Sequence, residues 1–227
     1  MQADYTPVEG KTTAFRSNEP NPMKFESLWE CFVEHAQSTI PNFTVDATNR
    51  PVLEAVLAYF TSNETWHQKL GINPEKGLFL LGPVGCGKTT IMQLFAHQRF
   101  HLVATRDIAK NFIKDGHSVL ERYGTQSFRK KHLGHGPILQ YDQPITYCFD
   151  DLGVEPNTKV YGNGCNVMAE ILLDRYDQFV RYGMLTHMTT NLSADTLERL
   201  YGDRVRSRLR EMFNLISFPV EAPDRRK

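Results

Sequence analysis

Hydrophobic positions change their spacing near residue 77, and this change divides the chain into two parts. Between residues 25 and 40, apolar side chains recur every three or four positions, which predicts one face of a helix. A second helix is predicted after Pro51, because proline suits the first turn of a helix. Residues 1–22 are polar and contain several prolines, which is typical of a flexible segment. We therefore expect residues 1–41 to form a flexible leader and an amphipathic helix, as a candidate partner-binding region.

From residue 77 onward, short apolar segments alternate with segments of helical spacing. Strands are predicted over residues 78–81, 101–105, 145–149, 184–189 and 215–220. Helices are predicted over residues 89–100, 106–123, 167–182, 193–200 and 203–213, and a basic loop over residues 126–136. This alternation is typical of a mostly parallel sheet that helices cover on both faces, so the predicted fold class is α/β.

Residues 82–89 match the phosphate-loop pattern GxxxxGK[ST] between a predicted strand and a predicted helix. Glycines let the backbone curl so that its N–H groups face phosphate oxygens, and the start of the helix adds positive potential. Lys88 is expected to reach the phosphates, and the Thr89 hydroxyl to bind Mg²⁺. A chance match is the alternative, which the flanking elements disfavour. The candidate nucleotide contacts are Gly82, Pro83, Val84, Gly85, Cys86, Gly87, Lys88, Thr89 and Thr90.

Two acidic residues follow the apolar strand at residues 145–149. Parallel strands present their carboxyl ends to the ligand, so Asp150 is predicted to hold Mg²⁺ together with Thr89. Asp151 is the candidate to orient or deprotonate an attacking water. The alternative is a strand that ends in a solvated turn.

Further polar residues follow the fourth strand and line a later helix. Asn191 stands where a side chain can bridge the γ-phosphate and the water, although a turn or helix cap is the simpler alternative. Arg204 and Arg208 lie one helical turn apart, and one of them is a candidate arginine finger toward a neighbouring subunit. A solvated basic helix face is the alternative.

The order of these motifs resembles that of AAA+ ATPases. More narrowly, the chain resembles the DnaC/IstB family of helicase loaders and transposition helpers, which are related to the initiator DnaA. The residues that carry this resemblance are 149–153 (Phe-Asp-Asp-Leu-Gly), 174–176 (Asp-Arg-Tyr), 190–192 (Thr-Asn-Leu) and 203–209 (Asp-Arg-Val-Arg-Ser-Arg-Leu).

The resemblance implies a AAA+ ATPase domain over residues 42–227, with five parallel strands in the order 5-1-4-3-2. It implies ATP and Mg²⁺ as cofactors, self-association into an oligomer or filament, and Arg208 as the finger with Arg204 as an accessory. It also implies DNA, chiefly single-stranded, and a replicative helicase or a transposase as partners. Loading of a helicase and assistance to transposition stay open as alternatives.

In this family an extra element between the second strand and the acidic strand contacts DNA. Here that interval is rich in cations that could bind phosphates, although a solvated surface is the alternative. The DNA-binding candidates are Lys110, Lys114, Arg122, Arg129, Lys130 and Lys131.

Two features depart from the family pattern. Many AAA+ enzymes carry Glu where Asp151 stands, and the shorter acid favours slow, assembly-dependent hydrolysis. Only seven residues follow Val220, so we expect no full C-terminal helical lid, and Arg225 and Arg226 are weak candidates for the arginine of such a lid.

Charge is distributed unevenly along the 227 residues. Residues 1–75 hold 5 Lys and Arg against 10 Asp and Glu, a net charge of −5, and the remainder holds 21 against 16, a net charge of +5. The overall neutrality therefore does not argue against DNA binding. The four cysteines are widely spaced and the chain has no long apolar segment, which predicts a cytoplasmic protein without membrane contact. A small-molecule kinase and a non-hydrolysing ATP-binding adaptor are the alternative functions.

Overall fold

The structure, a computed structural model, describes residues 25–97, 99–132, 140–155, 158–160 and 163–226. The expected flexible leader at residues 1–22 lies outside this part of the chain. None of the helices described has the length and apolar composition needed to cross a bilayer.

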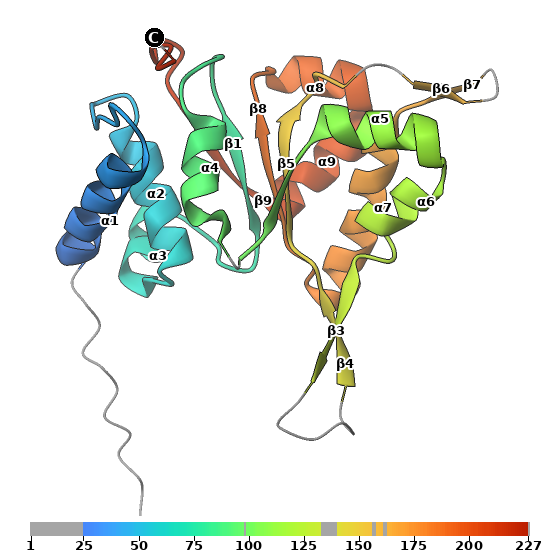
Figure 1. Ribbon diagram of the computed structural model, residues 1–227, viewed down its shortest axis with the longest axis horizontal. Helices are drawn as coiled ribbons and strands as arrows, with labels where there is room; N and C mark the ends of the chain where they lie inside the picture. Colours follow the sequence, from blue (N-terminus) through green and yellow to red (C-terminus); the bar gives the residue numbers. More distant parts are fainter. Residues whose placement is uncertain (1–24, 98, 133–139, 156–157, 161–162, 227) are drawn as a thin grey trace, which may run out of the picture.

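A five-stranded parallel sheet forms the centre of the molecule (Figure 1). The strands, in spatial order, are β2 (His101–Ala104), β5 (Tyr147–Leu152), β8 (Thr186–Thr190), β1 (Gly77–Leu81) and β9 (Phe213–Ser217). Taken as five strands in chain order, this is the arrangement 5-1-4-3-2, so the predicted topology is confirmed. All neighbouring strands pair in parallel, and their carboxyl ends therefore meet at one edge.

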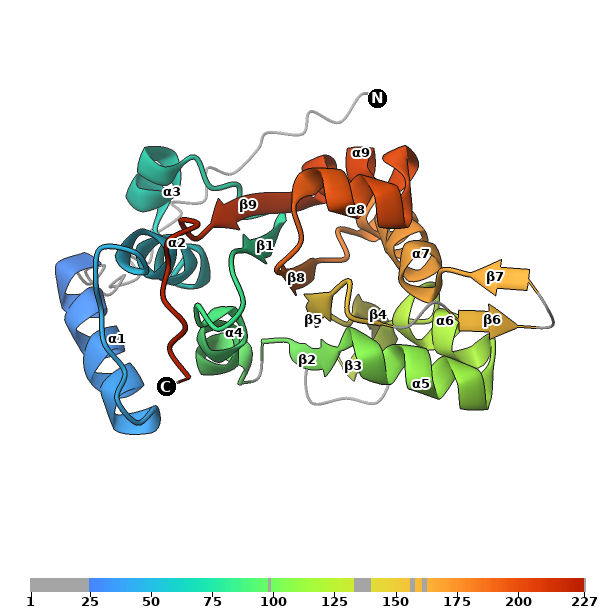
Figure 2. The ribbon, with the colours of Figure 1, turned by 90° about the horizontal axis from the view of Figure 1, so that it is seen from above.

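Helices cover both faces of the sheet, as Figure 2 shows from above. One face carries α1 (Phe25–Thr39), α2 (Arg50–Phe60), α3 (Glu64–Leu70) and α4 (Lys88–Ala96). The other carries α5 (Thr105–Asp115), α6 (Ser118–Tyr123), α7 (Val167–Tyr182), α8 (Ala194–Tyr201) and α9 (Asp203–Met212). Each face of the sheet has its own hydrophobic core. Because side chains alternate across a strand, Leu78 and Leu80 of β1 belong to the core under α1–α4, and Phe79 belongs to the core under α5–α9.

The amphipathic helix α1 packs on the core. Its buried Phe32 stacks on Phe95 of α4 with ring centroids 5.3 Å apart, and Phe25 stacks on Trp66 of α3 at 3.9 Å. Most of the apolar face that the sequence predicts is therefore used inside the molecule. The division at residue 41 and a partner role for the segment before it stay predictions.

Two small hairpins lie outside the central sheet. The first joins β3 (Phe128–His132) to β4 (Gln140–Pro144), and the second joins β6 (Thr158–Val160) to β7 (Asn163–Cys165). The predicted loop over residues 126–136 is thus wrong where β3 forms. The sequence of β3 is Phe-Arg-Lys-Lys-His, and it lacks the alternation of apolar and polar residues by which strands are predicted.

Candidate functional site

The predicted phosphate loop connects β1 to α4, and its conformation requires glycine. Gly85 and Gly87 have φ angles of 82° and 107°, in the left-handed region that residues with a Cβ atom rarely adopt. Helix α4 begins directly afterwards at Lys88, so its free N–H groups and its positive end face the loop. The local structure is therefore suited to bind an anion.

A cavity of about 230 Å³ opens in front of this loop, and we call it the P-loop cavity. Its lining brings together residues from four separate segments of the chain. They are Val84, Gly85, Gly87, Lys88, Thr89, Thr90, Asp151, Val154, Asn191 and Arg226. The loop, the second acid and Asn191 thus meet at the carboxyl edge of the sheet, as their positions in the sequence predict.

Lys88 is held inside the loop. Its ammonium group donates hydrogen bonds to the carbonyl oxygens of Gly82 and Pro83, at 2.8 and 2.9 Å, and the residue is only 5% exposed. These contacts satisfy the buried charge and keep it beside the cavity.

Asp150 is buried at the end of β5 and accepts two hydroxyl hydrogen bonds. The donors are Thr89 Oγ1 at 2.9 Å and Thr189 Oγ1 at 2.7 Å. Burial raises the pKa of Asp150 above its usual value, although the two threonines oppose this rise. A carboxylate and a hydroxyl are hard oxygen donors, so Thr89 and Asp150 fit a Mg²⁺ ion.

Asp151 occupies an irregular position in β5. Its φ angle is 57°, and the pairing of β5 with β8 shifts between Phe149 and Leu152. Its N–H donates to Thr189 Oγ1 at 2.9 Å, which fixes this bulge. The bulge places Asp151 in the lining of the P-loop cavity. Thr189 therefore organises both acids, a role that the sequence analysis missed. Its only signal was its position at the end of a buried strand.

The two candidate finger residues lie on α9 and do not line the P-loop cavity. The Arg208 guanidinium lies over the Tyr176 ring, 4.7 Å from its centroid, and donates to the Arg204 carbonyl oxygen at 3.2 Å. Arg204 is exposed. Neither residue thus contributes to the P-loop cavity of its own chain, and their action toward another subunit stays a prediction.

A second cavity of about 340 Å³ lies beside the loop, and we call it the Asp46 cavity. Its walls come from the segment before α2, from the start of α4 and from the segment after β9. Cys86 lies in its lining and is buried, which raises the pKa of the thiol.

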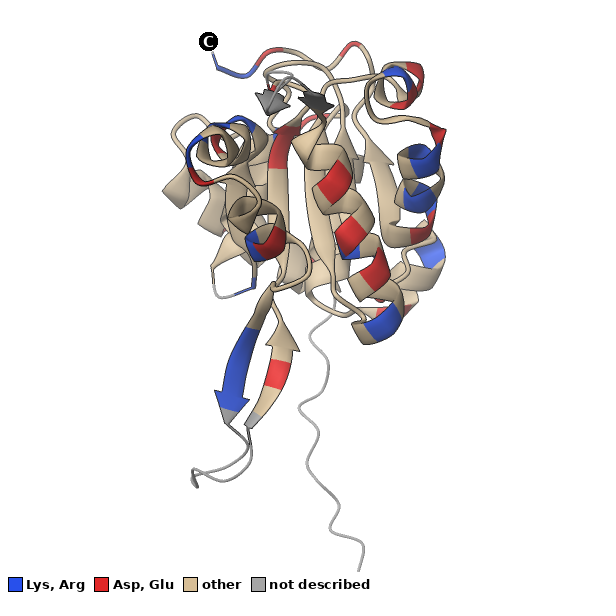
Figure 3. Cartoon of the chain, turned by 90° about the vertical axis from the view of Figure 1, so that its right-hand side faces the viewer, with Lys and Arg blue, Asp and Glu red and all other residues tan. Residues whose placement is uncertain are grey.

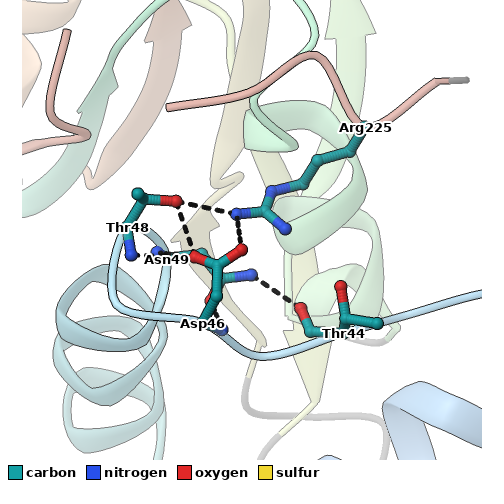
Figure 4. Close-up of polar contacts among 5 residues, drawn as sticks. All are labelled: Thr44, Asp46, Thr48, Asn49 and Arg225. Carbon is teal, nitrogen blue, oxygen red and sulfur yellow. Dashed lines mark hydrogen bonds and ion pairs between the residues drawn. The ribbon is translucent and has the colours of Figure 1, made fainter. Parts of the chain in front are cut away.

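The segment after β9 forms one wall of both cavities. The Arg225 N–H donates to the Gly85 carbonyl oxygen at 2.9 Å. Its guanidinium donates to Asp46 Oδ2 at 2.7 Å and to Thr48 Oγ1 at 2.9 Å (Figure 4). Hydrogen bonds from Thr48 lower the pKa of Asp46 to about 2. Partial burial opposes this shift, and the hydrogen bond and charge of Arg225 add to it.

Arg225 and Arg226 stand out in the sequence as candidates, whereas Asp46, the acidic partner of Arg225, does not. Arg226 lies in the lining of the P-loop cavity, and its guanidinium donates to Asp224 Oδ2 at 2.7 Å. Asp46 belongs to a tight turn in which its side chain accepts from the Thr48 and Asn49 N–H groups. From the sequence, that turn indicates only local structure.

The DNA-binding candidates separate into two groups in space. Lys110 and Lys114 lie on α5 and Arg122 on α6, whereas the other three lie on β3. Figure 3 shows β3 as a basic strand that projects from the end of the molecule away from the P-loop. DNA binding by either group stays a prediction.

No family model matches the chain. Among curated proteins, the human ATPase family gene 2 protein homolog B is 26% identical over 160 residues, which are 69% of this chain and 18% of that protein. The proteasome-activating nucleotidase of Thermococcus onnurineus is 40% identical over 52 residues, or 22% of this chain and 13% of the relative. An uncharacterized protein of Schizosaccharomyces pombe is 29% identical over 54% of this chain and 26% of its own length. The chain thus spans about a quarter or less of these relatives.

Among solved structures, the DnaC helicase loader is 18% identical, with a TM-score of 0.48 over 84% of this chain and 99% of that chain. A putative primosome component from Streptococcus pyogenes is also 18% identical, with a TM-score of 0.49 over 78% and 83%. DnaA from Aquifex aeolicus, bound to AMPPCP, is 16% identical with a TM-score of 0.48 over 81% and 50%.

Three features of the structure define the fold. They are the strand order, the glycine loop between β1 and α4, and the acidic end of β5 beside that loop. The chain has the fold of a AAA+-type P-loop NTPase, which confirms the predicted fold class.

Proposed function

We propose that this chain is a AAA+ ATPase of the DnaC/IstB type, which assembles on DNA with ATP and recruits or loads a partner, either a replicative helicase or a transposase. The observation that carries the proposal is that one cavity is lined by Lys88, Thr89, Asp151 and Asn191. Asp150 lies beside them and accepts a hydrogen bond from Thr89. In this proposal the P-loop cavity takes the phosphates of ATP, and the adjoining Asp46 cavity takes the nucleoside.

This chain's own residues would bind the phosphates, hold Mg²⁺ and position the attacking water. Lys88 exchanges its carbonyl partners for phosphate oxygens, and Thr89 and Asp150 hold Mg²⁺. When bound, Mg²⁺ would offset charge on the β- and γ-phosphates. Asn191 and Asp151 position a water, whose oxygen forms a bond to the γ-phosphorus as the bond to the bridging oxygen breaks. Asp151 accepts the proton of that water. Its short side chain, fixed in a bulge, favours slow turnover.

Assembly completes the site in this proposal. Neither Arg204 nor Arg208 lines the P-loop cavity of its own chain, which leaves both for the nucleotide of a neighbour. A guanidinium supplied by a second subunit would stabilise the transition-state charge, so hydrolysis would depend on oligomer formation. DNA would promote this assembly through the cations of α5, α6 and β3.

The test is ATPase activity of the wild type, Lys88→Ala and Arg208→Ala, each with and without single-stranded DNA. We expect Lys88→Ala to lose nucleotide binding, and Arg208→Ala to bind ATP but to lose the DNA-stimulated rate. An Arg208→Ala protein with the wild-type rate under assembling conditions would refute the finger assignment.

Sedimentation with ATP, with and without DNA, separates the alternatives. A monomer that transfers phosphate to a metabolite and ignores DNA would identify a small-molecule kinase. An ATP-dependent change of oligomeric state without turnover would identify a non-hydrolysing adaptor.

A further inference from the structure

A third cavity, of about 440 Å³, lies at the other end of the sheet from the P-loop, and we call it the hairpin cavity. It opens where β2 begins and where the chain enters β5, beside the base of the β3–β4 hairpin. Its lining includes Arg99, His101, Arg129 and Lys131, and no acidic residue occurs among the described residues that line it. We propose that the hairpin cavity binds the phosphate backbone of single-stranded DNA, a site that rests on the DNA association proposed above and gives it a location.

The β3–β4 hairpin separates its charges between two faces. In the antiparallel register, Arg129 faces Gln143, Lys130 faces Asp142 and Lys131 faces Tyr141. Side chains alternate along a strand, so Arg129 and Lys131 share one face while Lys130 lies on the other. The Lys130 ammonium lies 2.8 Å from Asp142 Oδ1 and is charge-paired. Arg129 donates only to the neutral Gln143 amide oxygen at 3.1 Å, and Lys131 has no ion pair among the described residues.

Another cation, Arg99, reaches the hairpin cavity from the turn before β2. The Arg99 guanidinium lies 5.1 Å from the centroid of the Phe60 ring and donates to the Phe60 carbonyl oxygen at 3.2 Å. This contact holds the charge in place while the residue stays exposed. His101, the first residue of β2, is also exposed. The cations Arg99, Arg129 and Lys131 thus stand on separate segments around a space whose described lining holds no acidic residue.

The neighbouring aromatic residue favours a nucleic-acid strand as the ligand. Tyr141 is 40% exposed and lies on the same face of the hairpin as Lys131, its partner in the register. Proteins that bind single strands combine a basic groove for the backbone with aromatic side chains on which bases stack. A free phosphate ion would use the cations and leave Tyr141 without a role. The arrangement therefore fits a strand that extends from the hairpin cavity along the hairpin.

The test is binding of fluorescein-labelled oligo-dT, followed by fluorescence anisotropy over a series of salt concentrations. We expect the double variant Arg129→Gln/Lys131→Gln to weaken binding by about tenfold or more, and to reduce the slope of log K against log salt by about 1.4. Lys130→Gln is the matched control, because it removes one charge from the same strand on the paired face. It should change affinity by less than about threefold.

A further variant separates a nucleic-acid strand from a simple anion. Tyr141→Ala removes the stacking surface without a change of charge, so we expect about fivefold weaker binding with an unchanged salt slope. Retention of ATP binding by each variant shows that it has folded. Equal effects of the double variant and of Lys130→Gln would overturn the proposal. Loss of binding to an acidic peptide, with oligo-dT binding intact, would overturn it in favour of a protein ligand.

This experiment can fail independently of the proposed ATPase. If Lys88→Ala abolishes ATP hydrolysis while the hairpin variants bind oligo-dT as the wild type does, the hairpin proposal fails and the ATPase proposal stands. If oligo-dT binding depends on Arg129 and Lys131 but no hydrolysis occurs, the hairpin cavity stands and the proposed enzyme fails.

Discussion

The guanidinium of Arg225 lies 2.7 Å from a carboxylate oxygen of Asp46, and this ion pair joins the segment after β9 to the turn before α2. The two residues are 179 positions apart in the sequence. Both line the Asp46 cavity, and the Arg225 N–H donates a hydrogen bond to the Gly85 carbonyl oxygen of the phosphate loop. The ion pair therefore fixes two walls of the cavity that we assign to the nucleoside.

Removal of this ion pair should weaken nucleotide binding. We expect Arg225→Ala to raise the Kd for a fluorescent ATP analogue about fivefold, because a partly buried, hydrogen-bonded charge pair contributes about 1 kcal/mol. Arg50→Ala is the control, since it breaks an ion pair with Glu54 in which the Arg50 side chain is 60% exposed. Equal affinities of the two variants would contradict the assignment of the cavity.

Thr89→Ala should uncouple Mg²⁺ from nucleotide binding. The substitution removes the hydroxyl that lies 2.9 Å from Asp150, and with it one of the two oxygen donors proposed for the ion. We expect about tenfold weaker ATP binding in Mg²⁺ and little change in EDTA, a difference that a titration under both conditions measures. A similar loss in EDTA would mean that Thr89 acts on the loop rather than on the metal.

Asp151→Asn should separate binding from hydrolysis. The amide preserves the shape of the side chain in the bulge but cannot accept a proton. We therefore expect kcat to fall about 100-fold or more, while the Kd for ATP stays within about twofold. Single-turnover hydrolysis under assembling conditions provides the measurement. A wild-type rate for this variant would remove Asp151 from the mechanism.

His187 should make the stability of the fold depend on pH. Its Nδ1 accepts a hydrogen bond from the Leu78 N–H at 3.0 Å, and burial, aided by the charge of Arg175, lowers its pKa to about 3. The unfolded chain binds a proton near pH 6.5 and the folded chain does not, so this contribution is present above pH 6.5 and is lost as the pH falls toward 3. Between pH 7.5 and 5.5 we expect a loss of about 1.4 kcal/mol from this group.

Urea unfolding at both pH values tests this expectation. His187→Gln keeps an acceptor for the Leu78 N–H but cannot titrate, so its free energy of unfolding should change less between the two pH values than that of the wild type. Identical pH dependences in the two proteins would rule out His187 as the group responsible.

Arg175 should be essential for stability. It is fully buried and donates four hydrogen bonds, to Thr186 Oγ1 and to the carbonyl oxygens of Tyr123, Ile145 and Leu185. Lysine cannot reach the same acceptors, so Arg175→Lys should lower the free energy of unfolding by about 3 kcal/mol. Arg181→Lys, at an exposed position of the same helix, should change it by less than about 0.5 kcal/mol. Denaturant unfolding of the two variants makes the comparison.

Most of the carboxyl edge of the sheet, where the P-loop cavity lies, could be predicted from the sequence because its signals are local. Apolar strands fix the centre of the sheet, and parallel strands bring their carboxyl ends together, so Lys88, Asp150 and Asn191 were expected at one edge. The pairing of Arg225 with Asp46 has no local signal, since it depends on how the end of the described chain crosses the loop. In the sequence, Arg175 is only one of the residues that carry the family resemblance, whereas the structure places it inside the core.

The β3–β4 hairpin shows another limit of hydrophobic patterns. Its first strand contains only one apolar residue, Phe128, and is held by backbone pairing with β4. The sequence marks these basic residues as candidate DNA contacts, but their division between a paired and an unpaired face follows from the register alone.

The path of the chain at Arg226 has a practical consequence. Arg226 lines the P-loop cavity, and the N–H of the preceding residue, Arg225, donates a hydrogen bond to Gly85 of the loop. A fluorescent label attached at position 226 would lie next to the phosphates that we propose the P-loop cavity binds. Such a label would be well placed to report the proposed ATP binding, while a bulky group at this position would obstruct it.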